Sequence, residues 1–478
     1  MPADLDEMFE ALGRQADVLP LAGAAAARRR GRQRTWTRAA VSAAAATVLV
    51  LVGVGFALRD PHPRADKPVA PPTRSAPDVP VLGTVSLGAG KIVTAYTAQD
   101  GVRAYTTWIR YEDNSAWVIA ADLGTGKQAW PARQIVDPDR SVEQILVVPS
   151  AVLVLTRAHN GSRPARGLFA FDPGTGAPLW HSDATEDESF VFADEMLVRS
   201  SRESGVVEGF DWRTGSRRWQ VDQRADPPLR TLGMTVAADE ERIDWSGPRA
   251  DLSDGRFVVV TVAGEVQLRY AWNGDVTRFT SLPPGTGDTM AAYGGWLFSH
   301  DEADDSGGPY RIRATGLAGD GGSTIVGTVP GRFVTLAGCG PNRVCVITVP
   351  KAGGGGTVIT AFDVAKHRQL WQEASKYGGD QIATARGYTM LSAADGGYEL
   401  FDAKGARIFS ADLSTGWLDA GTLLIYAPDG TGRWSRWSIA DRKITPLGKP
   451  PGEHFFCAST SSLVACPTPN GLTIWRVR

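Results

Sequence analysis

Side chains that could carry catalytic chemistry are scattered along the chain rather than grouped by type. The six histidines lie in neither a His-Glu-x-x-His nor a Gly-x-Ser-x-Gly setting, so the local signatures of zinc proteases and hydrolases are missing. The acidic stretch 301–305 could attract a hard cation such as calcium, but it lacks the alternating ligands and fixed glycine of a calcium loop. We therefore expect a solvated loop there, and we predict no catalytic residue, no metal site and no bound cofactor.

The four cysteines form two close pairs in the sequence, Cys339 with Cys345 and Cys457 with Cys466. Each pair flanks what reads as the turn of one hairpin. Neither pair has the Cys-x-x-Cys spacing of a zinc site, and no histidine stands beside it at ligand spacing. We predict two local disulfides, 339–345 and 457–466, which are typical of domains exported to an oxidising compartment.

The element that recurs along the chain is a β-hairpin, seen most clearly in residues 168–180. An apolar run of strand type leads into Asp172, a turn containing Gly174 and Gly176 follows, and a second short strand carries Trp180. An aspartate can accept hydrogen bonds from turn amides, glycine allows positive φ, and the tryptophan supplies a large apolar body. The repeat aspartates and tryptophans are therefore expected to serve turns and packing rather than catalysis.

Copies of this hairpin return at spacings of 50 and then 39 residues, and later copies keep only part of the pattern. The turn and packing residues that we assign are Asp122, Trp130, Asp172, Trp180, Asp211, Trp219, Asp363, Trp371, Asp402 and Asp441. The gap between Asp211 and Asp363 has room for degenerate copies, with 270–275 and 310–322 as the best candidates. A period near 40 residues with strand signals predicts the blades of a β-propeller.

We predict an all-β propeller of four-stranded blades over residues 81–478. Counting one of the two weak middle copies as no blade gives eight blades, with seven or nine left open. The last strand, 472–477, has no hairpin partner of its own, so we expect residues 81–87 to complete its sheet and close the ring.

The hairpin pattern resembles the quinoprotein-like (PQQ-like) β-propeller repeat, in which an apolar strand precedes Asp-x-x-Thr-Gly and a tryptophan follows four residues after the glycine. That family includes quinone-dependent dehydrogenases and also non-enzymatic scaffolds, such as the lipoprotein propeller subunit of the outer-membrane barrel assembly machine. Many of the dehydrogenases carry an adjacent Cys-Cys disulfide against the cofactor, and this chain has no adjacent cysteines. The resemblance therefore implies the fold more strongly than any one activity.

The residues before the repeats predict a membrane anchor. Residues 1–38 form a polar tail that ends in an arginine cluster, residues 39–58 carry no charge and are long enough to cross a bilayer as a helix, and residues 59–80 form a proline-rich linker. The positive-inside rule then places the N-terminus in the cytoplasm and the propeller, 81–478, outside the cell membrane. A cleaved signal peptide is the rival interpretation. The overall plan resembles proteins of high-GC Gram-positive bacteria.

The expected function is that of a non-catalytic binding or scaffold module for a protein or a cell-envelope ligand. The net charge of −2 and the absence of a basic stripe in the repeats argue against nucleic acid. A second possibility is a transmembrane sensor, because apolar residues within 3–15 recur at helical spacing and could hold a cytoplasmic partner. A quinone-dependent dehydrogenase is a third, and a propeller glycosidase or lyase, which would need a carboxylate pair in the central funnel, is a fourth.

Overall fold

The structure is a computed structural model that describes residues 78–477 with internal gaps. The gaps are 136–139, 149, 159–165, 194–195, 235–251, 254, 302–308, 319–320, 351–355, 386, 394–396, 413–414, 420, 427–431 and 451–456. The predicted tail, the predicted membrane helix and all but the last residues of the predicted linker lie outside the described residues. Within the described residues, every element is a strand, and none is a helix that could cross a membrane.

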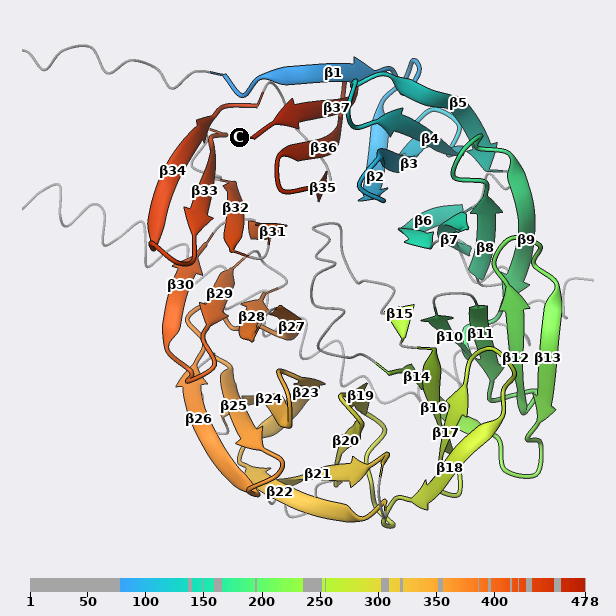
Figure 1. Cartoon of the computed structure of the whole chain (residues 1–478), viewed down its shortest axis with the longest axis vertical. Coiled ribbons are helices and arrows are strands. Elements are labelled where there is room, and N and C mark those ends of the chain that lie inside the picture. The colour runs from blue at the N-terminus through green and yellow to red at the C-terminus, as the bar shows by residue number, and fades with distance from the viewer. Residues whose placement is uncertain are drawn as a thin grey trace, which may run out of the picture. The chain divides into compact units, whose positions relative to one another are not determined.

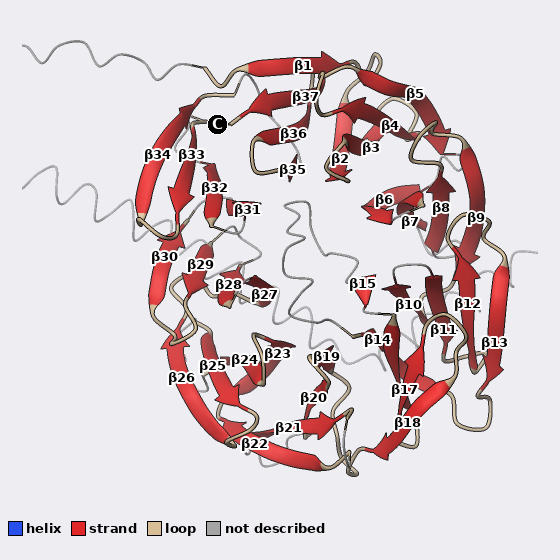
Figure 2. Ribbon diagram, in the orientation of Figure 1, coloured by secondary structure: helices blue, strands red, loops and turns tan. Residues whose placement is uncertain are grey.

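Residues Ser75–Arg478 form one compact unit. Its sheets stand around a common centre (Figures 1 and 2). In most sheets the strand that comes first in the chain is innermost and the strand that comes last lies on the perimeter; the two exceptions are the sheets that contain β15 and β1. We number these sheets as blades in chain order.

Blade 1 contains β2 (Ile92–Gln99), β3 (Arg103–Arg110), β4 (Ala116–Asp122) and β5 (Gln128–Ile135). Blade 2 contains β6 (Arg140–Val148), β7 (Ala151–Ala158), β8 (Arg166–Phe171) and β9 (Pro178–Ala184). Blade 3 contains β10 (Glu188–Ala193), β11 (Met196–Ser201), β12 (Val206–Asp211) and β13 (Arg217–Asp222). Blade 4 contains β14 (Pro228–Gly233), β16 (Arg256–Thr261), β17 (Glu265–Tyr270) and β18 (Val276–Ser281). Blade 5 contains β19 (Ala291–Tyr293), β20 (Trp296–His300), β21 (Tyr310–Gly316) and β22 (Ser323–Val329). Blade 6 contains β23 (Arg332–Gly338), β24 (Arg343–Val349), β25 (Val358–Asp363) and β26 (Arg368–Ala374).

Blade 7 contains β27 (Gln381–Ala385), β28 (Tyr388–Ser392), β29 (Tyr398–Phe401) and β30 (Arg407–Ala411). Blade 8 contains β31 (Thr415–Asp419), β32 (Thr422–Tyr426), β33 (Trp434–Ser438) and β34 (Lys443–Gly448). Blade 9 contains β35 (Ala458–Ser459), β36 (Leu463–Thr468) and β37 (Gly471–Arg476), together with β1 (Val81–Val85) from the start of the described chain.

The described strands form nine sheets, so the predicted number of eight blades is wrong. Both weak middle copies belong to blades of four described strands: residues 270–275 form the outer turn of blade 4, and residues 310–316 form strand β21 of blade 5. These two hairpins lack the turn aspartate and the tryptophan, yet their strands still pair in the same antiparallel order. Backbone pairing and apolar burial therefore define a blade here, whereas the turn chemistry is optional.

The predicted ring closure is confirmed. Strand β1 pairs antiparallel with β37, with Val81 opposite Trp475 and Val85 opposite Leu472. The side-chain oxygens of Thr84 and Thr473 lie 3.2 Å apart across this pair. The ninth blade thus combines the first and the last described strands, which leaves no open gap in the ring.

The apolar core is distributed around the ring rather than gathered in one place. Each buried cluster draws its residues from adjacent blades: Leu153 of blade 2 with Trp212 of blade 3, for example, and Val326 of blade 5 with Phe362 of blade 6. Together, eight such clusters cover every junction between neighbouring blades, including the junction of blades 9 and 1. Each sheet is therefore stabilised on both faces by its neighbours.

One short strand departs from the regular pattern. Strand β15 (Leu252–Ser253) lies in the connection between β14 and β16 of blade 4, but it pairs in parallel with β10, the innermost strand of blade 3. Blade 3 consequently has a fifth strand on its inner edge, supplied by its neighbour. The sequence carries no signal for this crossover.

Candidate binding surface on the propeller

The turn aspartates of blades 1 to 3 are occupied by hydrogen bonds within their own turns. In blade 1, Oδ1 of Asp122 accepts hydrogen bonds from the amide and the hydroxyl of Thr125, both at 2.8 Å. Asp172 accepts equivalent bonds from Thr175 at 2.8 and 2.9 Å. The hydroxyl bond is the main reason that the pKa values of both carboxyl groups lie below their ordinary values. These carboxylates stabilise turns and are not free for chemistry.

Asp211 in blade 3 makes the same turn bonds to Thr214 and one more contact. The guanidinium of Arg218 donates a hydrogen bond to Oδ2 of Asp211 at 2.7 Å. This bond is the largest cause of a pKa lowered to about 2. The bond from Arg218 thus adds to the turn bonds in holding Asp211 in its charged form.

In the later blades the assigned aspartates serve their turns less completely. Asp363 accepts one bond from the amide of Lys366 at 3.0 Å, and Asp402 accepts bonds from the amides of Lys404 and Ala406 at 2.8 and 2.9 Å. Without the threonine of the early repeats, each aspartate loses its hydroxyl donor.

The assignment of Asp441 to the turn position is wrong. Strand pairing places Ser438 opposite Thr422, as Asp122 is placed opposite Arg103 in blade 1. Asp441 occupies the position of the repeat threonine, and its amide donates to the Ser438 hydroxyl at 3.4 Å. The spacing of 39 residues between Asp402 and Asp441 is thus a coincidence of two different turn positions.

The repeat tryptophans join each blade to the next. The indole N–H of Trp130 donates to the carbonyl of Pro173 at 3.2 Å, and that of Trp180 donates to the carbonyl of Trp212 at 2.6 Å. The indole N–H of Trp219 likewise donates to Ala271 of blade 4 at 2.8 Å. Trp371 packs against Phe401 of blade 7 with ring centroids 5.8 Å apart, and its own N–H has no hydrogen-bond partner. These side chains pack between neighbouring blades.

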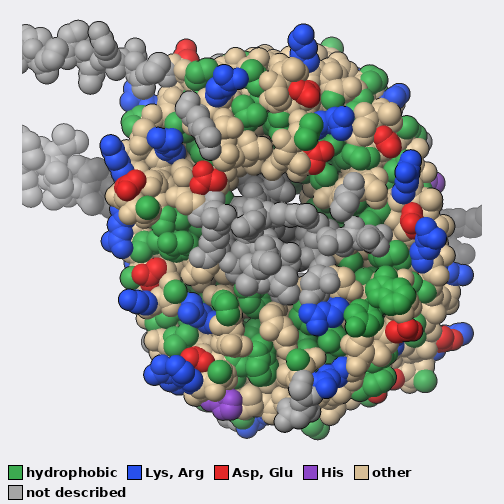
Figure 3. Space-filling view, in the orientation of Figure 1, with side chains coloured by type: hydrophobic (Ala, Val, Ile, Leu, Met, Phe, Trp, Pro, Cys, Tyr) green, Lys and Arg blue, Asp and Glu red, His purple; other side chains and the backbone are tan. Residues whose placement is uncertain are grey.

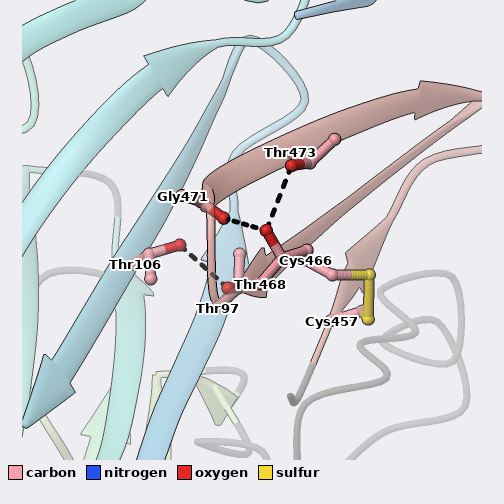
Figure 4. Close-up of a disulfide and its surroundings, with 7 residues drawn as sticks. All are labelled: Thr97, Thr106, Cys457, Cys466, Thr468, Gly471 and Thr473. Atoms are coloured by element: carbon pink, nitrogen blue, oxygen red, sulfur yellow. Dashed lines mark hydrogen bonds between the residues drawn. A yellow bond between two sulfur atoms is a disulfide. The ribbon is translucent and has the colours of Figure 1, made fainter. Parts of the chain in front are cut away.

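The two predicted disulfides are present. Cys339 and Cys345 link the turn after β23 to β24, and Cys457 and Cys466 link the residue before β35 to β36. All four cysteines are buried. Figure 4 shows Cys466 near Thr468, whose hydroxyl donates to the carbonyl of Gly471 at 2.8 Å, at the point where β36 turns into β37. Each disulfide therefore fastens a single hairpin, and the second lies in the blade that closes the ring.

The described histidines lie on three separate blades and are not brought together. His181 stacks on Phe169, and His300 packs against Phe333 with ring centroids 4.1 Å apart. His367 occupies a turn with φ of +48°. Asp301, the first residue of the acidic stretch, is buried and paired with Arg311 and Arg313. Among the described residues, no group of three or more His, Cys, Asp or Glu side chains could hold a metal ion.

In blade 3, two glutamates lie around one arginine. The guanidinium of Arg199 is 2.9 Å from Glu208 and 3.9 Å from Glu188, and Arg217 is 2.8 Å from Glu208. Burial raises the pKa of Glu188 above its ordinary value, and the charge of Arg199 opposes that rise. With arginines on both carboxylates, the group forms an ion-pair network across β10, β11, β12 and β13.

The surface that the sequence did not reveal is an aromatic group on blade 4. Tyr270 and Trp272 are 40% and 62% exposed, and their ring centroids are 6.0 Å apart. Phe279, on the adjacent outer strand β18, is 62% exposed. We call Tyr270, Trp272 and Phe279 the blade 4 aromatic residues. Figure 3 shows hydrophobic side chains grouped on the near face over this part of the ring.

The blade 4 turn has the same backbone form as the turns of the early repeats. The amide of Gly274 donates to the carbonyl of Tyr270 at 2.9 Å, as Gly126 does to Asp122 at 2.9 Å. Tyr270 therefore occupies the position of the turn aspartate, and Trp272 the position of Gly124. In the sequence, the sign of this surface is that a tyrosine and a tryptophan replace the repeat aspartate and glycine at these two positions. Such replacements look like those of a degenerate copy of the repeat.

A buried network of polar side chains supports the turn that carries Trp272. Arg269 is 5% exposed and donates to the side-chain oxygen of Gln267 at 2.6 and 2.8 Å and to the carbonyl of Gly274 at 2.5 Å. Gln223 of blade 3 donates to the same oxygen of Gln267 at 2.5 Å. Arg269 thus ties the turn carrying Trp272 to strand β17 and, through Gln267, to the neighbouring blade. The turn is held in place before any ligand binds.

Fold and surface together define a β-propeller with nine blades among the described strands, some of which keep the Asp-turn hairpin, and with a pair of exposed aromatic rings, Tyr270 and Trp272, on blade 4. Residues 114–266 match the family model described as outer membrane protein assembly factor BamB, of the PQQ-like repeat group. The matched stretch runs from the start of β4 into β17. It supports the PQQ-like repeat expected from the sequence, over these residues. No curated protein matches the sequence.

Several solved structures are similar to this chain. BamB from Moraxella catarrhalis is 15% identical with a TM-score of 0.39, over 70% of this chain and 96% of that one. The computationally designed Ika8 protein is 14% identical with a TM-score of 0.44, over 71% and 97%. Dihydro-heme d1 dehydrogenase NirN is 13% identical with a TM-score of 0.45, over 80% and 82%. Identities at this level do not transfer any activity to this chain.

Proposed function

We propose that the protein is a non-catalytic binding module whose propeller binds a protein or polymer of the cell envelope through the blade 4 aromatic residues. The observation that carries this proposal is the contrast in exposure. Trp130 and Trp212 are 3% and 1% exposed because they pack between blades, whereas Trp272 is 62% exposed. A large aromatic side chain held in water by a buried support is typical of a binding surface.

The family match agrees with this proposal at the level of class. BamB is named as an assembly factor, which is a scaffolding role rather than a catalytic one. The residues that resemble catalytic groups are engaged in turns and ion pairs in this chain: Asp122 with Thr125, and Glu208 with Arg199 and Arg217.

The proposed setting is the outer side of a cell membrane. Residues 39–58 would anchor the chain as a single helix, residues 1–38 would remain in the cytoplasm, and residues 59–80 would hold the propeller away from the bilayer. Two buried disulfides support an oxidising compartment for the propeller.

A thermal-shift titration tests the binding proposal. The purified protein is titrated with cell-wall fragments and simple sugars, and separately with pyrroloquinoline quinone plus calcium. A ligand that binds only the folded protein raises the melting temperature by mass action. We expect a shift with a wall fragment in the wild-type protein that is lost in Trp272→Ala. Tyr111→Ala is the matched control, because Tyr111 is also an exposed aromatic residue, 67% exposed, but lies beyond β3 in blade 1.

A protein ligand is tested by site-specific photo-crosslinking in intact cells. A photoreactive residue at position 272 is expected to capture a defined partner that the same residue at position 111 does not. The proposal fails if quinone with calcium shifts the melting temperature, or if Trp272→Ala and Tyr111→Ala have equal effects on both assays.

A further inference from the structure

The turn between β17 and β18 of blade 4 combines aromatic rings with an amide and a carboxylate. Tyr270 and Trp272 expose their rings, and Asn273 and Asp275 follow in the same turn. In blades 1 and 2 the corresponding stretch is Gly-Thr-Gly, and its one side chain, the threonine, is bonded to the turn aspartate. The blade 4 turn therefore carries a set of side chains that could contact a ligand and that those turns lack.

The two rings of this turn are suited to two ligand rings rather than one. Their centroids are 6.0 Å apart and their planes differ by 38°, so a single flat ligand ring cannot lie against both. The face of an aromatic ring is negative, and the C–H bonds on one face of a pyranose sugar carry a small positive charge, so the two faces attract each other. Successive units of a sugar chain are rotated relative to one another and can therefore stack on Trp272 and Tyr270 in turn.

The carboxylate of Asp275 supplies the polar part of the same turn. Nδ2 of Asn273 donates to Oδ2 of Asp275, and the amide of Asp275 donates to Oδ1 of Asn273 at 3.0 Å. In the part of the chain that the structure describes, this is the only hydrogen bond to the carboxylate, and Asp275 is exposed. An ionised carboxylate has about four acceptor sites. Asp275 can thus accept hydrogen bonds from hydroxyl groups while Asn273 fixes its orientation.

The charges around the turn favour an uncharged ligand. Arg269 attracts Asp275, but it is 5% exposed, and its three nitrogens donate to Gln267 and to the carbonyl of Gly274. An acidic ligand would therefore meet the carboxylate of Asp275 while the guanidinium beneath the turn stays out of its reach. Such a juxtaposition of like charges is unfavourable.

The extent of the apolar surface favours a sugar chain over a protein. A stable protein interface covers about 800 Å² on each partner and has an apolar centre. Among the described residues of blade 4, the other large apolar side chains that are exposed are Phe279 and Val262, and Val262 lies at the opposite end of β17. Two aromatic rings beside a carboxylate suit a ligand that has apolar faces and hydroxyl groups at its edges.

We propose that the β17–β18 turn binds a chain of uncharged pyranose sugars, with Trp272 and Tyr270 stacked on neighbouring units and Asp275 bonded to their hydroxyl groups. This inference rests on the proposed function, because it names the class of ligand for the same surface. The turn is fixed in advance: the amide of Ala271 donates to the carbonyl of Gly255, and the indole N–H of Trp219 donates to the carbonyl of Ala271, both at 2.8 Å. Binding therefore costs little ordering of the turn.

Isothermal titration calorimetry of the purified full-length protein tests the proposal. The probes are three neutral hexasaccharides, cellohexaose, maltohexaose and N-acetylated chitohexaose, and one acidic hexasaccharide, hexagalacturonate. We expect at least one neutral probe to bind, and to bind more tightly than the acidic one. Its affinity should fall about tenfold in Trp272→Ala and about threefold in Trp272→Phe, which keeps an aromatic face. Tyr111→Ala, at an exposed aromatic residue of blade 1, should leave the affinity unchanged.

Asp275→Asn gives a readout that a merely structural role would not produce. The variant loses one acceptor group and the negative charge, so the neutral probe should bind about threefold more weakly. The affinity for hexagalacturonate should rise, because the like charge is gone. A change of the same sign for both probes would contradict the role given to Asp275.

The failure of this inference can be told apart from failure of the proposed function. The inference is overturned if none of the neutral probes binds, if hexagalacturonate binds the wild-type protein more tightly than they do, or if Trp272→Ala keeps the wild-type affinity. If a photoreactive residue at position 272 still captures a protein in those cases, the binding surface stands and only its ligand class is wrong. If position 272 captures nothing either, both proposals fail.

Discussion

At the scale of single residues, Asp211 shows how hydrogen bonds and an ion pair at a turn contribute to the folding stability of the propeller. Asp211 accepts bonds from Thr214 and from Arg218, and its carboxyl group is 22% exposed while the guanidinium is 57% exposed. A pKa of about 2 in the folded chain, against an ordinary value of 3.8, means that protonation opposes folding. The stabilisation is complete above about pH 4 and is lost as the pH falls towards 2.

The prediction at this scale concerns Asp211→Asn. The amide oxygen still accepts from Thr214, but the attraction to Arg218 is lost, so the free energy of unfolding at pH 7 should fall by about 1 kcal/mol, after discounting for the exposed arginine. The difference from wild type should shrink as the pH is lowered from 4 to 2. Urea unfolding at a series of pH values measures it.

A deficit of equal size at every pH would show that the substitution acts through packing and not through the ion pair. Asp222→Asn is the comparison: Asp222 pairs with Arg224, but both side chains are more than half exposed, so a smaller deficit is expected.

At the scale of elements, the tryptophan of one blade and the turn glycine of the next form a fitted pair. Gly176 has φ of +68°, and a Cβ there would overlap the indole ring of Trp130. Gly215 meets Trp180 in the same way, with φ of +64°. The repeat glycine is therefore needed twice, once for the backbone of its own turn and once for the neighbouring blade.

Gly176→Ala should consequently destabilise the propeller by about 2 to 4 kcal/mol, from the left-handed backbone and the displaced indole together. Gly255→Ala separates the two causes, because Gly255 has φ of +81° and an added Cβ would meet nothing within 4 Å; about 1 kcal/mol is expected there. Midpoints of denaturant unfolding give both values. If the two variants lose the same stability, the contact with Trp130 contributes nothing.

How far the sequence could predict these elements depends on the turn chemistry. Where Asp, Thr and Gly all remain, as at 122–126, the sequence locates the hairpin correctly. In blade 8 the sequence pattern fails, because Ser438 occupies the position of the turn aspartate. A serine at that position cannot be recognised as a turn residue without knowing the strand register. In blade 5 the position is Gly316, opposite Trp296, with no polar side chain at all. A pattern based on side-chain hydrogen bonds misses blades that only the backbone ladder defines.

The aromatic surface escapes sequence-based prediction for a related reason. Trp272 departs from the repeat, and such a departure reads as decay, since one sequence does not show whether a side chain points into a blade junction or into water. By contrast, both cysteine pairs are predictable from spacing alone, because a disulfide across one hairpin needs only a short chain separation.

At the scale of the whole molecule, the ring is completed by one antiparallel pair between its two ends. Thr84 lies opposite Thr473 in that pair, 389 residues apart in sequence. Joining these two strands covalently would restrict the unfolded chain strongly, because the loop so closed is very long.

The variant Thr84→Cys/Thr473→Cys should therefore form a disulfide and raise the stability by about 2 to 5 kcal/mol. Differential scanning calorimetry of the oxidised protein measures the gain, and the single variant Thr84→Cys provides the baseline. A cross-link that forms but leaves the melting temperature unchanged would mean that unfolding begins at another blade junction.

The same closing pair also sets an order of events during synthesis. Blades 1 to 8 consist of strands consecutive in the chain, apart from the crossover at β15, so each can form soon after its own residues reach the compartment in which the chain folds. Strand β1 is made first among them but has no partner until residues 471–476 follow. A nascent chain therefore carries an open edge at each end until translation is almost finished. Any product that stops before residue 471 keeps those edges, which makes it a ready target for proteolytic clearance.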